Sequence, residues 1–501
     1  MIRTLTFFAF VTLLLSIALL GPSGATRPAS AATFNVTRTG DGADGVCDAD
    51  CSLREAIIAA AAAAGDDDTV TVPAGVYTLT ITGLGENASA TGDLDISEEL
   101  TINGAGAANT IIEVAGGTDR ALHVRDEAVT LTGVTIRNGK GGLGDGAAKG
   151  GAILVDDSAS LLITNSVLTN NQANDPVEGS EGGAIYNEGI LTVTNTTVIA
   201  NTAFGAGGGI FNAGSGVVVV NSSTFSGNSS VDSASGAIHN DGTLTINNST
   251  FADNHAGCEG GAIRSNETLI ITGSTFSGNS AVCRAGAILS ATTNITNSTI
   301  SGNTSLEEGG GLQSYGPLTM TNVTIANNSA PAGGGFVNSG DIATLTNVII
   351  AGNSPDDCAH FSPIPVSSHN LDSDATCGFT ALSDHQGADP MLGPLADNGG
   401  LTMTHALLPG SEAIDVGDNV DCPQTDQRGR ARPVDGDGQG GPVCDIGAFE
   451  LHPGDRIWGD LLCDGSPDST DALAILRFVA KLPPLDQNEP CPDIGTVVLL
   501  D

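Results

Sequence analysis

The sequence contains few basic residues and, after its first segment, no long apolar run. Seventeen Lys and Arg face 57 Asp and Glu, which leaves a formal net charge of −40. Recognition of nucleic acids and of anionic membranes requires clusters of Lys and Arg, so this charge balance excludes both as partners. No segment after residue 31 approaches the roughly 20 apolar residues that a membrane-spanning helix needs. We therefore expect no membrane span in the mature chain.

The N-terminal segment, 1–31, has the pattern of a secretory signal peptide. Arg3 supplies a positive charge near the start, residues 7–20 are apolar, and residues 29–31 read Ala-Ser-Ala, which suits a cleavage site. The apolar run is shorter than a membrane-spanning helix requires. We expect a secreted protein, either extracellular or held at the cell surface.

Ten cysteines in an exported chain favour disulfides. They form sequence-local pairs, namely Cys47/Cys51, Cys258/Cys283, Cys358/Cys377, Cys422/Cys444 and Cys463/Cys491. No Cys-x-x-Cys spacing and no Cys/His cluster indicates a zinc site. All ten are disulfide candidates, although the sequence alone does not determine their connectivity.

A repeat of about 25 residues runs through the middle of the chain. Its units contain a Gly-Gly-x-apolar element, and the apolar residue that closes it, or its nearest equivalent, is Ile153, Ile185, Ile210, Ile238, Ile263, Ile288, Leu312 and Phe336. Within each unit, apolar and polar residues alternate as in short strands, and Gly and Asn mark turns. Short strands without a helical pattern predict a mainly β fold, a right-handed parallel β-helix. Each unit would form one coil, and coils would stack at about 4.8 Å.

Stacked coils turn equivalent sequence positions into columns. Two columns of Asn are expected, one at Asn165, Asn195, Asn221, Asn248, Asn297, Asn322 and Asn347, interrupted by Gly273, and one at Asn171, Asn201, Asn228, Asn254, Asn279, Asn303, Asn328 and Asn353. Asn tolerates the left-handed bend of a corner, and stacked amides can bond along a column. Between these columns, Phe225, Phe251 and Phe276 form an inward stack flanked by Val198 and Ile300.

Two more columns follow from the same alignment. Cys258 and Cys283 are separated by one repeat, so a bridge between neighbouring coils is geometrically reasonable. The adjoining column reads Glu259, Arg284 and Glu308, whose alternating charges make favourable cross-strand pairs.

Changes of pattern divide the chain into five parts. The mature chain of about 470 residues can bury a large core and is expected to contain more than one structural unit. The parts are a signal peptide (1–31), an N-terminal cap with the first coils (32–149), regular β-helix repeats (150–358), C-terminal coils with a cap (359–451) and a small tail domain (455–501).

At CDADCSLREAI (47–57) the chain resembles a group of exported bacterial proteins named for the heptapeptide at 51–57. The run ADPMLGPLADNGGLTMTHALLPGSEAIDVGD (388–418), with TDQRGRARP (425–433) and CDIGAFE (444–450), is similar to the closing segment of the same group. The resemblance covers about residues 33–451. It implies export and a right-handed parallel β-helix related to pectin-lyase-like and polymorphic outer-membrane proteins, and it implies no settled activity.

The same motif also predicts a helix from its own residues. Ser52 and Glu55 form a Ser-x-x-Glu capping box, and the Ala-rich run that begins at Leu53 continues to Ala64, where Gly65 stops it. Such a helix can cover the open first coil of a solenoid, whose strand edge and core would otherwise be exposed. We interpret Arg54 and Glu55 as structural rather than catalytic.

No assembled catalytic cluster is evident in the repeats. Enzymes on this fold bring several carboxylates together on one face, often with an Arg or Lys as the base. The aspartates of the repeats lie mostly at corners or in insertions. Basic residues do gather before the repeats, at Arg120, Arg125, Arg137, Lys140 and Lys149, among Asp126 and Asp145. Arg120, Arg125 and Arg137 are the candidate catalytic residues, and a solvated loop face is the alternative.

The tail after residue 455 resembles one half of a type I dockerin. Asp460, Asp464, Asp468 and Asp471 take the first, fifth, ninth and twelfth places of a calcium loop, with the Ser466 carbonyl at the seventh, and a helical pattern follows. The resemblance implies a Ca²⁺ site and a cohesin-like partner protein. Leu462 at the third place and the lack of a second loop depart from the family, so we expect weakened calcium affinity. A Cys463–Cys491 bridge could replace the missing half.

These observations favour a secreted or surface β-helix protein that binds extracellular or cell-surface carbohydrate, as an adhesin or matrix component. The alternative is a pectate-lyase-like polysaccharide lyase or a glycoside hydrolase on the same fold. Fold resemblance alone is a weak argument for an enzyme activity, so binding is favoured over catalysis.

Overall fold

The computed structural model describes residues 31–453 and 455, apart from 64–66, 117–118, 142–147, 174, 176–178, 341, 361–363 and 365. The predicted signal peptide, except for residue 31, and the predicted calcium loop with Cys463 and Cys491 lie outside the described residues. Within this part of the chain, no helix has the length and apolarity needed to span a bilayer.

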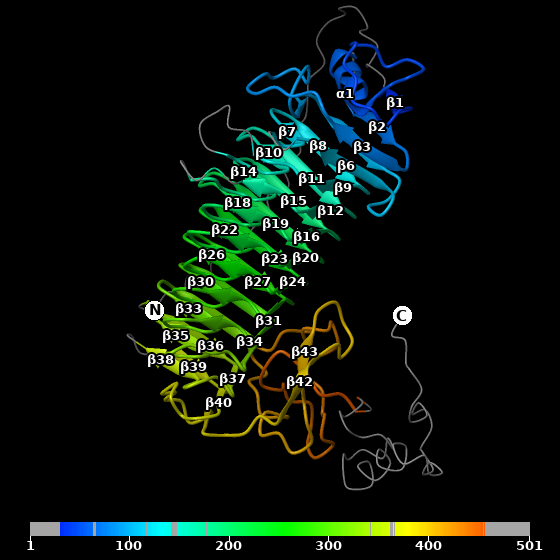
Figure 1. Cartoon of the computed structure of the whole chain (residues 1–501). Helices are drawn as coiled ribbons and strands as arrows, with labels where there is room; N and C mark the ends of the chain where they lie inside the picture. Colours follow the sequence, from blue (N-terminus) through cyan, green and yellow to red (C-terminus); the bar gives the residue numbers. More distant parts are fainter. Residues whose placement is uncertain are drawn as a thin grey trace, which may run out of the picture.

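Helix α1 (Leu53–Ala62) lies at the N-terminal end of a long solenoid of strands (Figure 1). Its start is the predicted capping box, because the Ser52 side chain accepts from the Glu55 main-chain N–H while the Glu55 carboxylate accepts from that of Ser52. The helix ends at Ala62, slightly before the expected end at Ala64. Its face of Leu53, Ala56 and Ile57 is buried against the first strands, so the helix covers the open end of the core as predicted.

Strands of neighbouring coils pair in parallel and form the walls of a β-helix. Sheet B has 11 strands: β4 (Leu94–Ile96), β7 (Leu122–Val124), β10 (Ile153–Val155), β14 (Ile185–Asn187), β18 (Ile210–Asn212), β22 (Ile238–Asn240), β26 (Ile263–Ser265), β30 (Ile288–Ser290), β33 (Leu312–Ser314), β35 (Phe336–Asn338) and β38 (Cys358–His360). Sheet C has six short strands: β13 (Gln172–Ala173), β17 (Thr202–Ala203), β21 (Ser229–Ser230), β25 (His255–Ala256), β29 (Ser280–Ala281) and β32 (Thr304–Ser305).

Sheet A has 24 strands and forms the rest of the wall. They are β1 (Thr33–Asn35), β2 (Asp68–Val72), β3 (Gly75–Leu79), β5 (Leu100–Gly104), β6 (Thr110–Val114), β8 (Ala128–Thr132), β9 (Thr135–Arg137), β11 (Ser160–Thr164), β12 (Val167–Thr169), β15 (Ile190–Thr194), β16 (Thr197–Ile199), β19 (Val217–Asn221), β20 (Thr224–Ser226), β23 (Thr243–Asn247), β24 (Thr250–Ala252), β27 (Leu269–Thr272), β28 (Thr275–Ser277), β31 (Thr293–Ser301), β34 (Leu318–Ala326), β36 (Ala343–Thr346), β37 (Ile349–Ala351), β39 (Val366–Ser368), β40 (Leu371–Asp372) and β41 (His385–Gln386).

The coils stack in the register that the repeat predicts. The column that begins with Ile153 and Ile185 continues residue by residue to Leu312 and Phe336 on sheet B. Inside the solenoid, the rings of Phe225, Phe251 and Phe276 stack at centroid distances of 4.9 Å, and Val198 and Ile300 extend the column at its two ends. All five side chains are fully buried. The predicted β-helix and its inward aromatic stack are confirmed.

The second Asn column forms a buried amide ladder. Each side-chain amide from Asn171 to Asn328 donates to the carbonyl oxygen of the next Asn at 2.8–3.0 Å. The left-handed residue is the one before each of these Asn, such as Ala200 (φ 54°) or Asp253 (φ 56°). The predicted bonding of stacked amides along the column is confirmed, but these Asn do not make the bend themselves, which corrects the other predicted reason for the column.

The first Asn column occupies the bend as predicted, with one correction. Asn165, Asn195 and Asn248 have φ near 50°, but between the last two this conformation belongs to Ser222 (φ 46°). Asn221 instead ends β19, in register with Thr194 and Asn247. The neighbouring Ser takes the bend, so Asn221 stays in the strand and does not form the corner.

Four disulfides join local pairs: Cys47–Cys51, Cys258–Cys283, Cys358–Cys377 and Cys422–Cys444. The Cys258–Cys283 bridge links neighbouring coils across a Cα distance of 4.5 Å. In the adjoining charged column, Arg284 pairs with Glu259 at 3.3 Å as predicted, but its second partner is Glu307 at 3.9 Å. The Glu308 carboxylate accepts a hydrogen bond from Gln313 instead.

The segment from 388 to 451 does not continue the solenoid; it folds back against the later coils, where Figure 1 shows it in orange beside β31 and β34. Its only described strands, β42 (Leu392–Ala396) and β43 (Thr404–Leu407), pair with each other in an antiparallel arrangement. Its apolar side chains, among them Leu407, Ile446 and Phe449, pack on Ile349 and Leu371 of the coils. We call residues 388–451 the C-terminal module.

Candidate functional site

Charged, histidine and aromatic side chains lie near one another on the outward face of sheet B. Its strands span three positions each, so the two end residues point into the core and the central one points out. In β10, for example, Ile153 and Val155 belong to the main core whereas Leu154 belongs to a separate cluster with Tyr186 and Phe211. The central residues form what we call the outer row: Asp95, His123, Leu154, Tyr186, Phe211, His239, Arg264, Leu289 and Gln313.

The N-terminal end of the outer row is a network of charges. His123 Nε2 lies 2.9 Å from Asp156 Oδ1, and His123 Nδ1 lies 3.2 Å from Asp95 Oδ1. The Arg125 guanidinium approaches the same Asp95 oxygen at 3.9 Å. Asp95 and His123 are both at least nine-tenths buried. The two carboxylates therefore hold the imidazole from both sides.

These contacts change the titration of the histidine. Burial alone would lower the pKa of His123, but the hydrogen bonds with Asp156 and Asp95 raise it to about 9. The imidazole is consequently a cation at neutral pH, with Nε2 hydrogen-bonded to Asp156 and Nδ1 paired with Asp95.

Beside the histidine, Arg120 and Asp93 form a second buried pair at 3.4 Å. Burial raises the pKa of Asp93 to about 7, against the opposing effect of Arg120, and burial also raises the pKa of Asp119. This part of the face thus contains one carboxyl, that of Asp93, whose pKa lies near neutral pH, which is a feature of functional sites and also of structural ion-pair networks.

By distance, Asp93, Asp95 and His123 could hold a metal ion. Cationic groups already face these acids, because the Arg120 guanidinium lies 3.4 Å from Asp93 and the His123 imidazole 3.2 Å from Asp95. The Arg120 and Arg125 guanidinium groups add positive charge beside the same acids. We interpret the group as a hydrogen-bonded ion network.

An aromatic stack occupies the middle of the outer row. The rings of Tyr186 and Phe211 are 5.1 Å apart and those of Phe211 and His239 are 4.9 Å apart, with interplanar angles of 5° and 8°. This spacing is that of the coils, so the rings lie face to face along the solenoid and turn their edges outward. The Lys149 ammonium covers the end of the stack, 4.3 Å from the Tyr186 ring centre. A ligand on this face therefore meets ring edges and polar groups rather than an open aromatic platform.

Two glutamates flank the stack with different environments. Glu188 accepts from the Lys149 ammonium at 2.9 Å. Glu181 lies in register with Lys149 on the neighbouring coil, and burial raises its pKa to about 7 while Lys149 opposes the shift. One carboxylate is thus held in an ion pair and the other is poised to exchange a proton, an arrangement that acid–base chemistry requires.

Beyond the stack, a polar network continues over the next coils. His239 Nε2 lies 3.2 Å from Asp241 Oδ1, and this hydrogen bond is the main cause of a lowered Asp241 pKa. Asn266 donates to the same oxygen at 2.6 Å and accepts from both Arg264 and the Tyr315 hydroxyl. The side chains here form a chain of donors and acceptors that is partly exposed to solvent.

The basic residues proposed from the sequence do not form one groove. Arg120 and Arg125 join the network around His123 and Asp95, but Arg137 lies on β9 of sheet A, where it pairs with Glu113 at 3.2 Å. Lys149 stands at the aromatic stack. Asp145, like the calcium-loop residues Asp460, Asp464, Ser466, Asp468 and Asp471, lies outside the described residues.

Sequence reasoning missed the acids and the histidine at the centre of the network. Asp95 and His123 are the middle residues of the triplets LDI (94–96) and LHV (122–124), which are aligned strands of sheet B. Recognising these triplets as equivalents of ILV (153–155) would have placed both side chains outward in one row. The triplets are spaced more widely than the regular repeat, and this hid their equivalence.

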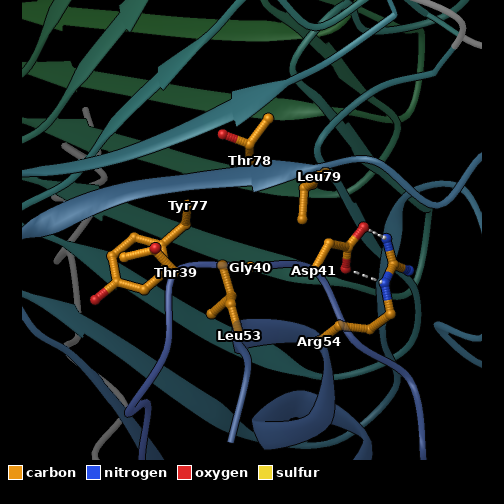
Figure 2. A pocket seen from close by; sticks show the side chains of 8 residues that line it. All are labelled: Thr39, Gly40, Asp41, Leu53, Arg54, Tyr77, Thr78 and Leu79. Atoms are coloured by element: carbon orange, nitrogen blue, oxygen red, sulfur yellow. Dashed lines mark hydrogen bonds and ion pairs between the residues drawn. The ribbon is translucent and has the colours of Figure 1, made fainter. Parts of the chain in front are cut away.

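Arg54 has a structural role, as predicted. Figure 2 shows its guanidinium directed at Asp41, to which it donates at 2.7 and 3.2 Å, and it also donates to main-chain carbonyls such as that of Gly92 at 2.8 Å. Asp41 in turn accepts from the main-chain N–H groups of Thr80 and Ile81. The hollow around this pair has no room for a water molecule. Arg54 clamps the capping helix onto the first coils, and the hollow is not a ligand site.

A second group of acids, Asp415, Asp435 and Asp437, lies in the C-terminal module. Asp415 accepts from the main-chain N–H groups of Gly436 and Asp437. The carboxylate thereby organises the turn that carries the other two acids, and its hydrogen bonds are explained by that local structure.

Comparison with known proteins agrees with the architecture. A family model described as a right-handed β-helix region matches residues 120–304. Together with the parallel pairing, this identifies the fold as the right-handed parallel β-helix predicted from the repeat. No curated protein matches the sequence.

Two solved structures are similar at low identity. The A-module of the mannuronan C-5 epimerase AlgE6 from Azotobacter vinelandii is 18% identical, with a TM-score of 0.38 over 70% of this chain and 95% of that chain. The PL6 family alginate lyase AlyGC is 11% identical, with a TM-score of 0.37 over 84% of this chain and 59% of that one. Likeness at this level does not extend to activity.

Proposed function

We propose that this protein binds an extracellular polysaccharide along the outward face of sheet B, as an adhesin or matrix component. The observation that carries the proposal is the row of partly exposed donors and acceptors from Asp156, which is paired with the buried His123, through Lys149 and Glu188 to Arg264. Polysaccharides present many hydroxyls in a line, and a line of alternating donors and acceptors suits them. Both signs of charge occur together on this face although the chain as a whole carries −40.

The test measures binding of the full chain to neutral and anionic polysaccharides by affinity electrophoresis and on a glycan array. Lys149→Gln combined with Arg264→Gln is expected to weaken binding about tenfold, because two charge-assisted hydrogen bonds are lost. Arg137→Gln is the matched control, since Arg137 is also a half-exposed, ion-paired cation but lies on sheet A. Equal losses in both proteins, or no binding by the unmodified chain, would contradict the proposal.

A second candidate function is cleavage of a polysaccharide, by a lyase or glycosidase mechanism. It is favoured by one observation, the pair of glutamates around Tyr186, of which Glu181 exchanges its proton near neutral pH. Turnover of pectate, alginate and β-glucans, measured with and without Ca²⁺, separates catalysis from binding. Activity that disappears in Glu181→Gln while binding persists would establish the enzyme. Loss of activity in Arg125→Gln would instead implicate the charged network.

For the tail after residue 455 we propose a calcium site and a partner protein, as its resemblance to a dockerin implies. Asp460, Asp464, Ser466, Asp468 and Asp471 would hold Ca²⁺, and a cohesin-like protein would be the partner. Calorimetry of the full chain with Ca²⁺ tests the first point, since heat that is unchanged in Asp460→Ala/Asp464→Ala would remove the metal from the proposal. The four disulfides are consistent with an oxidising, extracellular location.

A further inference from the structure

A band of uncharged residues on sheet A is partly covered by the C-terminal module and partly open. The covered band consists of Gly273, Asn297, Asn322 and Asn347 at the corners and Thr275, Thr299, Thr324 and Ile349 at the first outward position of β28, β31, β34 and β37. All eight are buried. The covered band is therefore an interface within the chain.

The covered band binds the module mainly through main-chain groups. Thr275 donates to the carbonyl of Met403 at 2.6 Å, Asn297 to that of Thr425 at 2.7 Å, and Thr324 accepts from the Ala448 N–H at 3.0 Å. Further along, Asn322 donates to the carbonyls of Asp445 and Gly447, and Asn347 both donates to the carbonyl and accepts from the N–H of Asp418. Five side chains of the band thus pair with the main chain of an irregular polypeptide, whereas Thr299 donates to the Gln427 side chain.

The same columns continue without a break into the preceding four coils. We call this continuation the open band: Asn165, Asn195, Ser222 and Asn248 at the corners, and Val167, Thr197, Thr224 and Thr250 at the first outward position of β12, β16, β20 and β24. Every one of these residues is partly or fully exposed. None is charged, in a chain with 57 acidic residues.

We propose that the open band binds an extended polypeptide segment of a partner protein through that segment's main-chain N–H and C=O groups. The reason is continuity, because the hydroxyl and amide groups that bind the module recur at the same positions, one coil apart, in the open part. A polypeptide partner is favoured over a sugar, since the covered band is already seen to pair with peptide groups. The absence of charge on the open band favours a partner segment without charged side chains.

The neighbouring outward row of sheet A provides a control. Thr192 on β15 and Thr245 on β23 belong to the same coils as Thr197 on β16 and Thr250 on β24, and all four are partly exposed. The row of Thr192 and Thr245 lies on the other side of the corner. Replacing either pair with Asp changes the net charge equally and places the new carboxylates in comparable surroundings.

The experiment uses the full chain and a labelled synthetic peptide with the sequence of residues 399–407, GGLTMTHAL, which includes the segment that contacts Thr275. Fluorescence anisotropy is expected to show saturable binding that weakens about tenfold or more in Thr197→Asp/Thr250→Asp, because the new charges would be buried without partners. Thr192→Asp/Thr245→Asp should bind like the unmodified chain. Circular dichroism checks that both variants are folded.

Three results would overturn the proposal. They are no saturable binding of the peptide, equal weakening in the two double variants, and an equilibrium between monomer and dimer in analytical ultracentrifugation that only Thr197→Asp/Thr250→Asp abolishes. The last result would assign the open band to a second copy of this chain. None of the three bears on the polysaccharide proposal, which concerns sheet B.

Discussion

Two aromatic stacks run along the solenoid with nearly the same geometry but in opposite surroundings. The inner stack, Phe225–Phe251–Phe276, has ring separations of 4.9 Å and angles of 8° and 10°. The outer stack, Tyr186–Phe211–His239, has separations of 5.1 and 4.9 Å and angles of 5° and 8°. The parallel register dictates the stacking in both, because equivalent residues of neighbouring coils must lie one strand spacing apart.

The difference between the stacks lies in what surrounds them. The inner one is extended by Val198 and Ile300 and is fully buried. The outer one meets Lys149 at one end, and its histidine contacts Asp241. The coil geometry therefore produces a column wherever a residue recurs, and only the chemical surroundings distinguish a column in the core from a column on the outward face.

Removing one ring from each stack should give the largest difference in the free energy of unfolding between the inner and the outer stack. Phe251→Ala leaves a cavity in the closed core and is expected to lower the free energy of unfolding by about 3–5 kcal/mol. Phe211 is 6% exposed and packs in a small cluster with Leu154 and Tyr186 outside the main core, so Phe211→Ala is expected to cost less, about 2–3 kcal/mol. Urea denaturation of the two variants measures both values. Equal losses would mean that the outer stack is a core element rather than part of an accessible face.

Raising the pH should weaken the outer row and leave the inner stack unaffected. The pKa of His123 is about 9 in the folded protein and near 6.5 in an unfolded chain. The folded-state value is the higher one, so the stabilisation is fully present below about pH 6.5 and is lost as the pH rises through 9. It amounts to at most about 3 kcal/mol. Asp93 acts in the same direction at lower pH, because its pKa is raised from 3.8 to about 7, so its contribution falls between about pH 4 and 7 and is constant above that.

Thermal unfolding at pH 6 and pH 9.5 measures this loss. In His123→Gln the difference between the two pH values should shrink, whereas in His255→Gln, a change at an exposed histidine on β25, it should match that of the unmodified protein. A difference that survives unchanged in His123→Gln would assign the pH dependence to other groups.

The contrast also explains what the sequence could and could not predict. The Phe251 column and the amide ladder recur at nearly regular intervals of one repeat, so simple alignment finds the register and the fold. The outer row departs from this spacing where it matters, notably between Leu154 and Tyr186, because loops of unequal length interrupt the coils there. Residues close in sequence also separate in space: Arg125 joins the network on sheet B, whereas Arg137 lies on sheet A.

The sequence does not decide which of two neighbouring residues occupies a corner or forms an ion pair. Asn221 and Ser222 can each occupy a left-handed corner, and the structure uses Ser222. Arg284 has two glutamates within reach, and the carboxylate of Glu308 is taken by Gln313. Such alternatives differ by small energies, which side-chain packing rather than sequence pattern resolves.

Replacing His239 with Phe sharpens the comparison, since it makes the outer stack resemble the inner one. The ring stacking is kept, so the free energy of unfolding should change by no more than about 1 kcal/mol. The hydrogen bond between His239 and Asp241 is lost, and polysaccharide binding should fall because Asp241 then keeps only the hydrogen bond from Asn266. His239→Ala removes the stacking as well and should cost more stability. Binding that is unchanged in His239→Phe would restrict the binding face to the coils around Lys149.

The smallest effect on stability is expected at Arg284, in the charged column of Glu259, Arg284 and Glu308 beside the outer row. Arg284 is 45% exposed and pairs with Glu259 at 3.3 Å, a distance that solvent and salt screen readily. Arg284→Gln should therefore change the free energy of unfolding by less than about 1 kcal/mol, and less still in high salt. Arg264→Gln is the comparison, because Arg264 lies in the outer row and pairs with the same glutamate at 2.6 Å. Arg284→Gln could instead prove the more costly of the two. In that case a place in the outer row does not determine the strength of an ion pair with Glu259.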